Sequence, residues 1–137
     1  MIYYDKICSL ENLYKAHRAA RCGKMGSREV IEFEMNLANH LFALRRSLLN
    51  RTYQIRSYYT FQVHEPKVRI IHALHYADRV VQHCICDQVL GPVLDKRLIN
   101  DNAAYRIGKG THFALDRLTQ FFVDFYRKHG PQGYILK

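Results

Sequence analysis

The sequence predicts an α+β fold that is mainly helical and carries one small antiparallel β-hairpin sheet. Apolar residues recur every three or four positions over residues 28–49 and again over 111–128, which is the period of a helix with one buried face. Between these segments, residues 59–73 contain the alternation of apolar and polar side chains that is typical of a strand. Helices followed by a hairpin and further helices indicate an α+β domain.

Two helices are predicted before the hairpin. Ser9 is placed to cap a helix over 10–21, and the segment 22–27 interrupts it with two glycines. Ser27 is placed to cap a long helix from Arg28 to about Leu49. The inward stripe of the first helix is Leu10, Leu13, Tyr14 and His17, and that of the second is Val30, Phe33, Leu37, Leu41, Leu44 and Leu48.

A β-hairpin follows, with one strand over 59–63 and its partner over 68–73. Glu65-Pro66-Lys67 forms the turn, because proline presets its own φ and cannot donate to a strand ladder. Lys67 and Arg69 then lie at or near the tip. Residues two apart on a strand face the same side, so this spacing is compatible with joint contact of the two cations with one ligand.

The remaining elements are two helices and the start of a strand. Ala77 or Asp78 opens a helix that Gly91-Pro92 ends, with Val80, Val81, Cys84, Ile85 and Val89 inward. Thr111 caps a long helix to about Lys128, and a strand begins over 134–136. The inward residues of this last helix are Ala114, Leu118, Phe121, Phe122 and Phe125.

Composition limits the class of protein. The 137 residues, 48% of them hydrophobic, suffice for one domain with a core. No run approaches the roughly 20 apolar residues of a membrane span, and no secretory signal opens the chain, so we expect a cytoplasmic protein without a membrane partner. The four cysteines are then expected as free thiols. A net charge of +9 favours a polyanionic partner, although an inert basic surface fits it equally well.

Four motifs resemble, in order, the fingers region of reverse transcriptases of the group II intron and bacterial retroelement type. They are YTFQVHEPKVRIIHA (59–73), DRVVQ (78–82), AYRIGKGTH (104–112) and YILK (134–137). The resemblance implies one domain over 1–137, with a helical N-terminal extension over 1–52 and the fingers hairpin and helices over 53–137. In that family the last strand leads into the first catalytic aspartate. The resemblance therefore implies a fragment without catalytic residues that stops at the start of the palm.

The resemblance also implies roles for individual cations. In the fingers of these enzymes a lysine and an arginine of the hairpin contact the triphosphate of the incoming dNTP, and Lys67 and Arg69 match them. Many intron-type relatives place a longer, glycine-containing tip between the two, whereas only Val68 separates them here. Contacts with template or primer phosphates are expected from two basic loops, which contain Arg21, Lys24 and Arg28 in one case and Arg106 and Lys109 in the other. A solvated loop is an equally open interpretation of the first.

Other chemistries find less support. The segment 106–111 is not a P-loop, because Gly-Lys is followed by glycine instead of serine or threonine and no buried strand precedes it. Turn geometry and a helix cap explain Gly108, Gly110 and Thr111. The histidines and cysteines over 72–86 lack the spacing of a zinc site, so no metal site is predicted. No serine or cysteine nucleophile with placed partners is recognisable either.

We therefore expect the fingers fragment of an RNA-directed DNA polymerase, a nucleotidyltransferase whose full-length form uses a pair of Mg²⁺ ions. The fragment alone should be inactive and hold no cofactor. Expected partners are template RNA, an RNA/DNA duplex, the dNTP and the missing palm domain, and a homodimer fits if the palm-facing surface is exposed. One alternative is a non-catalytic, maturase-like RNA-binding module. Another is a helical interaction domain whose basic charge is incidental.

Overall fold

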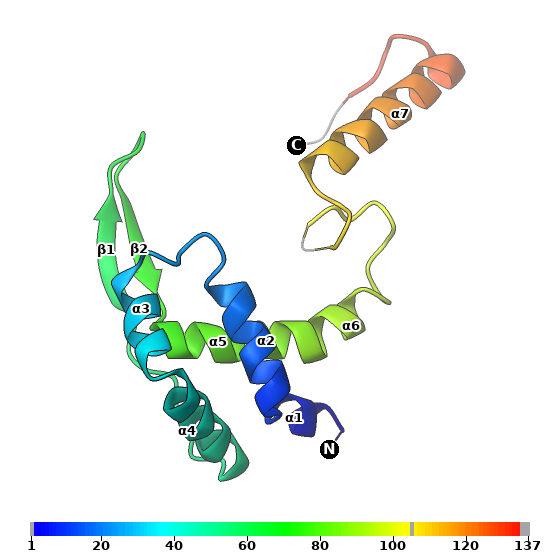
Figure 1. Cartoon of the computed structure of the whole chain (residues 1–137). Helices are drawn as coiled ribbons and strands as arrows, with labels where there is room; N and C mark the ends of the chain where they lie inside the picture. The colour runs from blue at the N-terminus through cyan, green and yellow to red at the C-terminus, as the bar shows by residue number, and fades with distance from the viewer. Residues whose placement is uncertain (1, 105, 135–137) are drawn as a thin grey trace. The chain divides into compact units, whose positions relative to one another are not determined.

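The computed structural model describes residues 2–104 and 106–134, which belong to two compact units (Figure 1). The first unit extends to Pro92, and the second begins at Val93. The α+β prediction is confirmed, because the described residues are mainly helical and contain one two-stranded antiparallel sheet. Over residues 2–104 and 106–134, no helix is both long and apolar enough to cross a membrane.

Helix α5 (Tyr76–Ile85) is the centre of the first unit. Helix α2 (Leu10–Ala20) packs against it most extensively, and α1 (Ile2–Ile7), α3 (Arg28–Met35) and α4 (Leu37–Leu49) also contact it. The segments 1–52 and 53–92 thus share one hydrophobic core. Its buried members are Ile7, Cys8, Leu13, Ala16, Ala20, Val30, Phe33, Leu41, Leu44, Leu48, Tyr76, Ala77, Val80, Val81 and Cys84.

The prediction of one continuous helix over 28–49 is wrong, because the helix breaks at Asn36, where φ is −134° and ψ is 42°. Two side-chain contacts span the break, and one of them involves a backbone carbonyl. The Asn39 amide donates to Asn36 Oδ1 at 2.7 Å, and His40 Nδ1 lies 3.0 Å from the Phe33 carbonyl oxygen. The predicted inward stripe is nevertheless buried on both sides of the break, apart from the partly buried Leu37.

The predicted N-cap positions of the first helices are confirmed, but the capping hydrogen bonds and one member of the predicted inward stripe are not. Ser9 and Ser27 occupy the N-cap positions of α2 and α3, but neither side chain forms a capping hydrogen bond within the described residues. Leu13 and His17 are buried as expected, whereas Tyr14 is 45% exposed. A tyrosine at the edge of an apolar stripe can keep its hydroxyl in water at little cost.

The prediction that Gly91-Pro92 ends the helix is wrong. Helix α5 continues as a π-helical segment (Cys86–Leu90) and then as α6 (Gly91–Leu94). The Gly91 N–H reaches back five residues to the Cys86 carbonyl, and Pro92 has no N–H to contribute to the next turn. The inward residues of this region are confirmed: Val80, Val81 and Cys84 are buried, and Ile85 and Val89 pack against the core.

The sheet consists of β1 (Tyr59–Val63) and β2 (Arg69–Ala73), paired in the register Tyr59 with Ala73 and Val63 with Arg69. None of the strand residues is buried. The hairpin therefore extends from the helices of its unit as a two-stranded arm, visible in green in Figure 1. A two-stranded sheet without a covering layer is only marginally stable by itself, so its anchorage at the base matters.

In the second unit, α7 (Thr111–His129) begins after Gly110, which holds the N-cap position that was predicted for Thr111. The prediction of an inward stripe on this helix is wrong: Ala114, Leu118, Phe121, Phe122 and Phe125 are all exposed. Apolar periodicity requires a partner for burial, and the described part of this unit contains no second long helix. Tyr134 is not in a strand, and residues 135 and 136 of the predicted strand lie outside the described residues.

Candidate nucleic-acid interface

The hairpin exposes an aromatic face. Because side chains alternate along a strand, the residues of one face are those of alternate positions: Tyr59, Phe61 and Val63 opposite Ala73, Ile71 and Arg69. The rings of Tyr59 and Phe61 lie 6.0 Å apart with 22° between their planes, and the two residues are 37% and 43% exposed. Exposed aromatic rings can stack with the bases of any sequence.

The tip of the hairpin is the loop 64–68, which carries Lys67, whereas Arg69 is the first residue of β2. Lys67 thus lies in the predicted turn, and because a period of two holds only along a strand, it does not fix whether the side chains of Lys67 and Arg69 face the same side. Within the described residues, neither cation forms an ion pair or a side-chain hydrogen bond. Both remain available to phosphate oxygens, which arginine can bind in a forked mode.

A buried carboxylate anchors the chain that leads into the hairpin. Asp78, in the first turn of α5, is only 3% exposed. The Tyr53 hydroxyl donates to its Oδ1 at 2.7 Å, and the backbone N–H of Arg56 donates to its Oδ2 at 3.2 Å. The dipole at the start of a helix also stabilises negative charge. Burial and the bond to Asp78 raise the pKa of Tyr53, so the hydroxyl keeps the proton that it donates.

A cleft of about 560 Å³ opens beside this anchor, between α3, α4, the segment 52–56 and the start of α5. One of its acidic lining residues, Glu29, pairs with Arg79, and the other oxygen of this carboxylate lies 3.9 Å from His75 Nδ1. Over the described residues, no group of three or more histidine, cysteine or acidic side chains is arranged to hold a metal ion.

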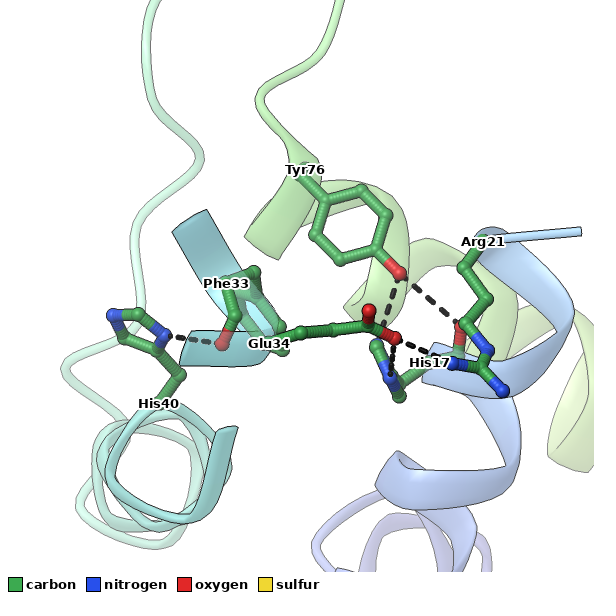
Figure 2. A network of polar contacts seen from close by, with 6 residues as sticks. All are labelled: His17, Arg21, Phe33, Glu34, His40 and Tyr76. Carbon is green, nitrogen blue, oxygen red and sulfur yellow. Dashed lines mark hydrogen bonds and ion pairs between the residues drawn. The ribbon is translucent and has the colours of Figure 1, made fainter. Parts of the chain in front are cut away.

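A second polar network joins α2, α3 and α5 (Figure 2). The Arg21 guanidinium donates to Glu34 at 2.6 Å, and the same carboxylate oxygen lies 3.3 Å from Nε2 of the buried His17. Nδ1 of His17 lies 2.9 Å from the Tyr76 hydroxyl. The Phe33 ring stacks on this imidazole with 5.5 Å between centroids. The network fixes the end of α2, from which the basic interhelical loop departs.

Burial lowers the pKa of His17, although the Glu34 carboxylate acts in the opposite direction. The imidazole is therefore neutral near pH 7. With its proton on Nε2 it donates to Glu34 and leaves Nδ1 to accept from Tyr76. Burial also raises the pKa of Tyr76, which keeps that donor protonated.

The predicted phosphate-binding cations of the first unit differ in their surroundings. Arg21 is partly buried and held by Glu34. Arg28 is 90% exposed at its side chain and pairs with Glu32 one helical turn away. Lys24 lies in the exposed loop, with no side-chain partner among the described residues. Of the three, only Lys24 could bind a phosphate without first giving up an intramolecular contact.

In the second unit, the cations of the loop before α7 form hydrogen bonds with other residues of the segment that leads into this helix. Arg106 donates to Asp95 at 2.6 Å and to the Ile99 carbonyl at 3.1 Å, and its side chain is only 16% exposed. Lys109 donates to the side-chain oxygen of Asn100 at 2.8 Å. These contacts order the loop, and a phosphate would have to compete with them.

Sequence reasoning did not find the partners Tyr53 and Glu34. The sequence contained only a weak indication of these contacts. A histidine on an inward stripe (His17) and an aspartate at the start of a buried helix (Asp78) each need a polar partner, but periodicity does not identify that partner. Both partners come from segments distant in sequence, 17 residues from His17 and 25 from Asp78.

A comparison of the chain with models of known protein families and with curated protein sequences found no match.

Proposed function

We propose that this chain is the fingers portion of an RNA-directed DNA polymerase, in which the hairpin holds the triphosphate of the incoming dNTP. The observation that carries the proposal is the exposed hairpin with two cations, Lys67 and Arg69, that have no acidic partner among the described residues. Some cations of the same unit, such as Arg21 and Arg79, are paired with carboxylates, so what distinguishes Lys67 and Arg69 from other unpaired cations is their place at the tip of an exposed arm. A folded chain that leaves two cations unpaired at the tip of an arm has them available for an external anion.

Nucleic acid is the second ligand of the proposed function. The excess of basic residues, 21 against 12 acidic ones, favours a phosphate backbone, and the exposed rings of Tyr59 and Phe61 favour unpaired bases. The Tyr53–Asp78 anchor ties the approach to the hairpin to helix α5. The hairpin that would hold the ligand is therefore anchored to the core of the unit through the segment that precedes it.

Primer extension combined with RNA binding tests the proposal. The chain should bind an RNA oligonucleotide with an affinity that falls steeply with salt, because each phosphate contact releases counterions. It should add no nucleotide to a primer annealed to that RNA in the presence of Mg²⁺ and dNTPs. Nucleotide incorporation would contradict the assignment of an inactive fragment. RNA binding without any response of the hairpin to dNTPs would favour a non-catalytic RNA-binding module.

A further inference from the structure

A long segment of the first unit contains basic residues and no acidic ones. Between Glu34 and Glu65 the chain has 30 residues without aspartate or glutamate, and among them are four arginines. Helix α4 lies in this segment: Arg45 and Arg46 are near its C-terminal end, and Arg51 follows two residues after Leu49, its last residue. Over the described residues none of these three has an acidic partner. The local positive charge is therefore uncompensated.

The outer face of α4 has a regular arrangement of hydrogen-bond donors. Two adjacent rows at helical spacing border a shallow groove of about 590 Å³. The first row is Asn39, Ala43, Arg46 and Asn50, and the second is Phe42, Arg45 and Leu49. All seven residues are exposed, including Phe42 at 55% and Leu49 at 52%. The face thus combines amide and guanidinium donors with apolar side chains that could pack on sugars or bases.

Arg51 has an unfavourable backbone conformation. Its φ of 56° lies in the left-handed region, where glycine is preferred. It closes α4 through hydrogen bonds from the Arg51 N–H to the Leu48 carbonyl at 3.0 Å and from the Thr52 N–H to the Ser47 carbonyl at 2.9 Å. Glycine would make the same turn at lower cost. An exposed arginine at such a position is better explained by what its side chain binds than by folding.

We infer that the outer face of α4, together with Arg51 just beyond its C-terminal end, binds the phosphate backbone of a nucleic-acid strand, at a surface separate from the hairpin. Arginine and asparagine are side chains that donate to phosphate and sugar oxygens. None of the seven residues that border the groove is acidic, so the groove itself presents no carboxylate that would repel a phosphate. The inference depends on the proposed function only for the class of partner. It adds residues that the resemblance did not indicate.

The test measures RNA affinity as a function of salt by fluorescence anisotropy, with a labelled single-stranded RNA of mixed sequence. The variant Arg46→Ala/Arg51→Gly removes two proposed contacts, and Arg97→Ala/Arg127→Ala removes the same charge from exposed positions of the second unit. With about 0.7 counterion released per single-strand phosphate contact, the slope of log K against log salt should become shallower by about 1.4 in the first variant. The control should keep the original slope.

The first variant should not melt below the unmodified chain, because glycine suits the conformation at residue 51. Equal losses in both variants would overturn the inference, since they would show only an effect of net charge. Loss of binding to polyglutamate with RNA binding intact would also overturn it and would identify an acidic protein as the partner. Lys67→Ala/Arg69→Ala should leave the α4 contribution to the salt slope unchanged, so the two proposals can fail independently.

Discussion

Replacing Tyr53 with phenylalanine should destabilise the first unit by removing one hydrogen bond from a buried carboxylate. The ring is retained, so little packing is lost. The change removes the hydroxyl that donates to Asp78 Oδ1 at 2.7 Å. Among the described residues, the backbone N–H of Arg56 then remains as the donor to this carboxylate. Asp78 is only 3% exposed, so water cannot readily replace the lost donor.

A hydrogen bond to a charged group contributes about 1.5–3 kcal/mol. A loss of about 2 kcal/mol corresponds to a roughly 30-fold change in the folding equilibrium, which is large against the 5–15 kcal/mol of a typical domain. With a urea m-value of about 1–1.5 kcal/mol/M for a unit of this size, the midpoint should fall by roughly 1.5 M.

Urea denaturation followed by circular dichroism measures this shift. Tyr58→Phe is the matched control, because Tyr58 is 57% exposed and forms no side-chain hydrogen bond with the described residues. The control should change the free energy of unfolding by less than about 0.5 kcal/mol. If Tyr53→Phe behaves like the control, the carboxylate does not depend on this donor and the reasoning about the anchor is refuted.

Three further predictions concern pH, backbone strain and thiol reactivity. Burial lowers the pKa of His17 in the folded state, so as pH falls below about 6.5 the unfolded chain takes up the proton first and the free energy of unfolding falls. A His17→Gln variant should show a flatter profile of urea midpoint against pH between 7.5 and 5, and an identical profile would contradict this role. Arg51→Gly alone should relieve about 1 kcal/mol of backbone strain and so raise the melting temperature by roughly 4–8 °C, whereas a lower melting temperature would show that residue 51 is unstrained. Cys22 is exposed, while burial raises the pKa of Cys84 to about 11. A thiol reagent should therefore modify Cys22 quickly and Cys84 only on unfolding, and rapid modification of Cys84 in the native protein would disprove its burial.

The sequence was sufficient for the elements whose burial follows a simple period. The stripe on α3 and α4 and the inward face of α5 are buried as predicted, because these helices pack on one another within one unit. The break at Asn36 could not be predicted, since the stripe keeps its spacing across it and the stabilising contacts are side-chain bonds that the pattern does not contain. The same periodicity on α7 is accompanied by exposed side chains, because a period describes one face and not its partner.

The sequence predicted which cations belong to the candidate site. It did not predict the hydrogen bonds and ion pairs that hold the surrounding segments in place. Hairpin and tip follow from alternation and from the position of Pro66, although the structure begins the second strand at Arg69, one residue later than predicted. The contacts of Arg106 and Lys109 with their own loop could not be read from the spacing of those residues. The Asp78 anchor depends on a tyrosine 25 positions earlier, and only the tertiary fold brings the two together.

The most direct test of the central claim is a titration of the isotopically labelled chain with a dNTP and Mg²⁺, followed by amide chemical shifts. Two solvent-exposed cationic contacts of about 1 kcal/mol each should give a dissociation constant of roughly tens of millimolar, which this method detects at high dNTP concentration. We expect shifts concentrated in residues 64–69 and their loss in Lys67→Ala/Arg69→Ala, with Lys96→Ala/Arg97→Ala as the matched control. Shifts that avoid the hairpin, or that survive in the hairpin variant, would contradict the account.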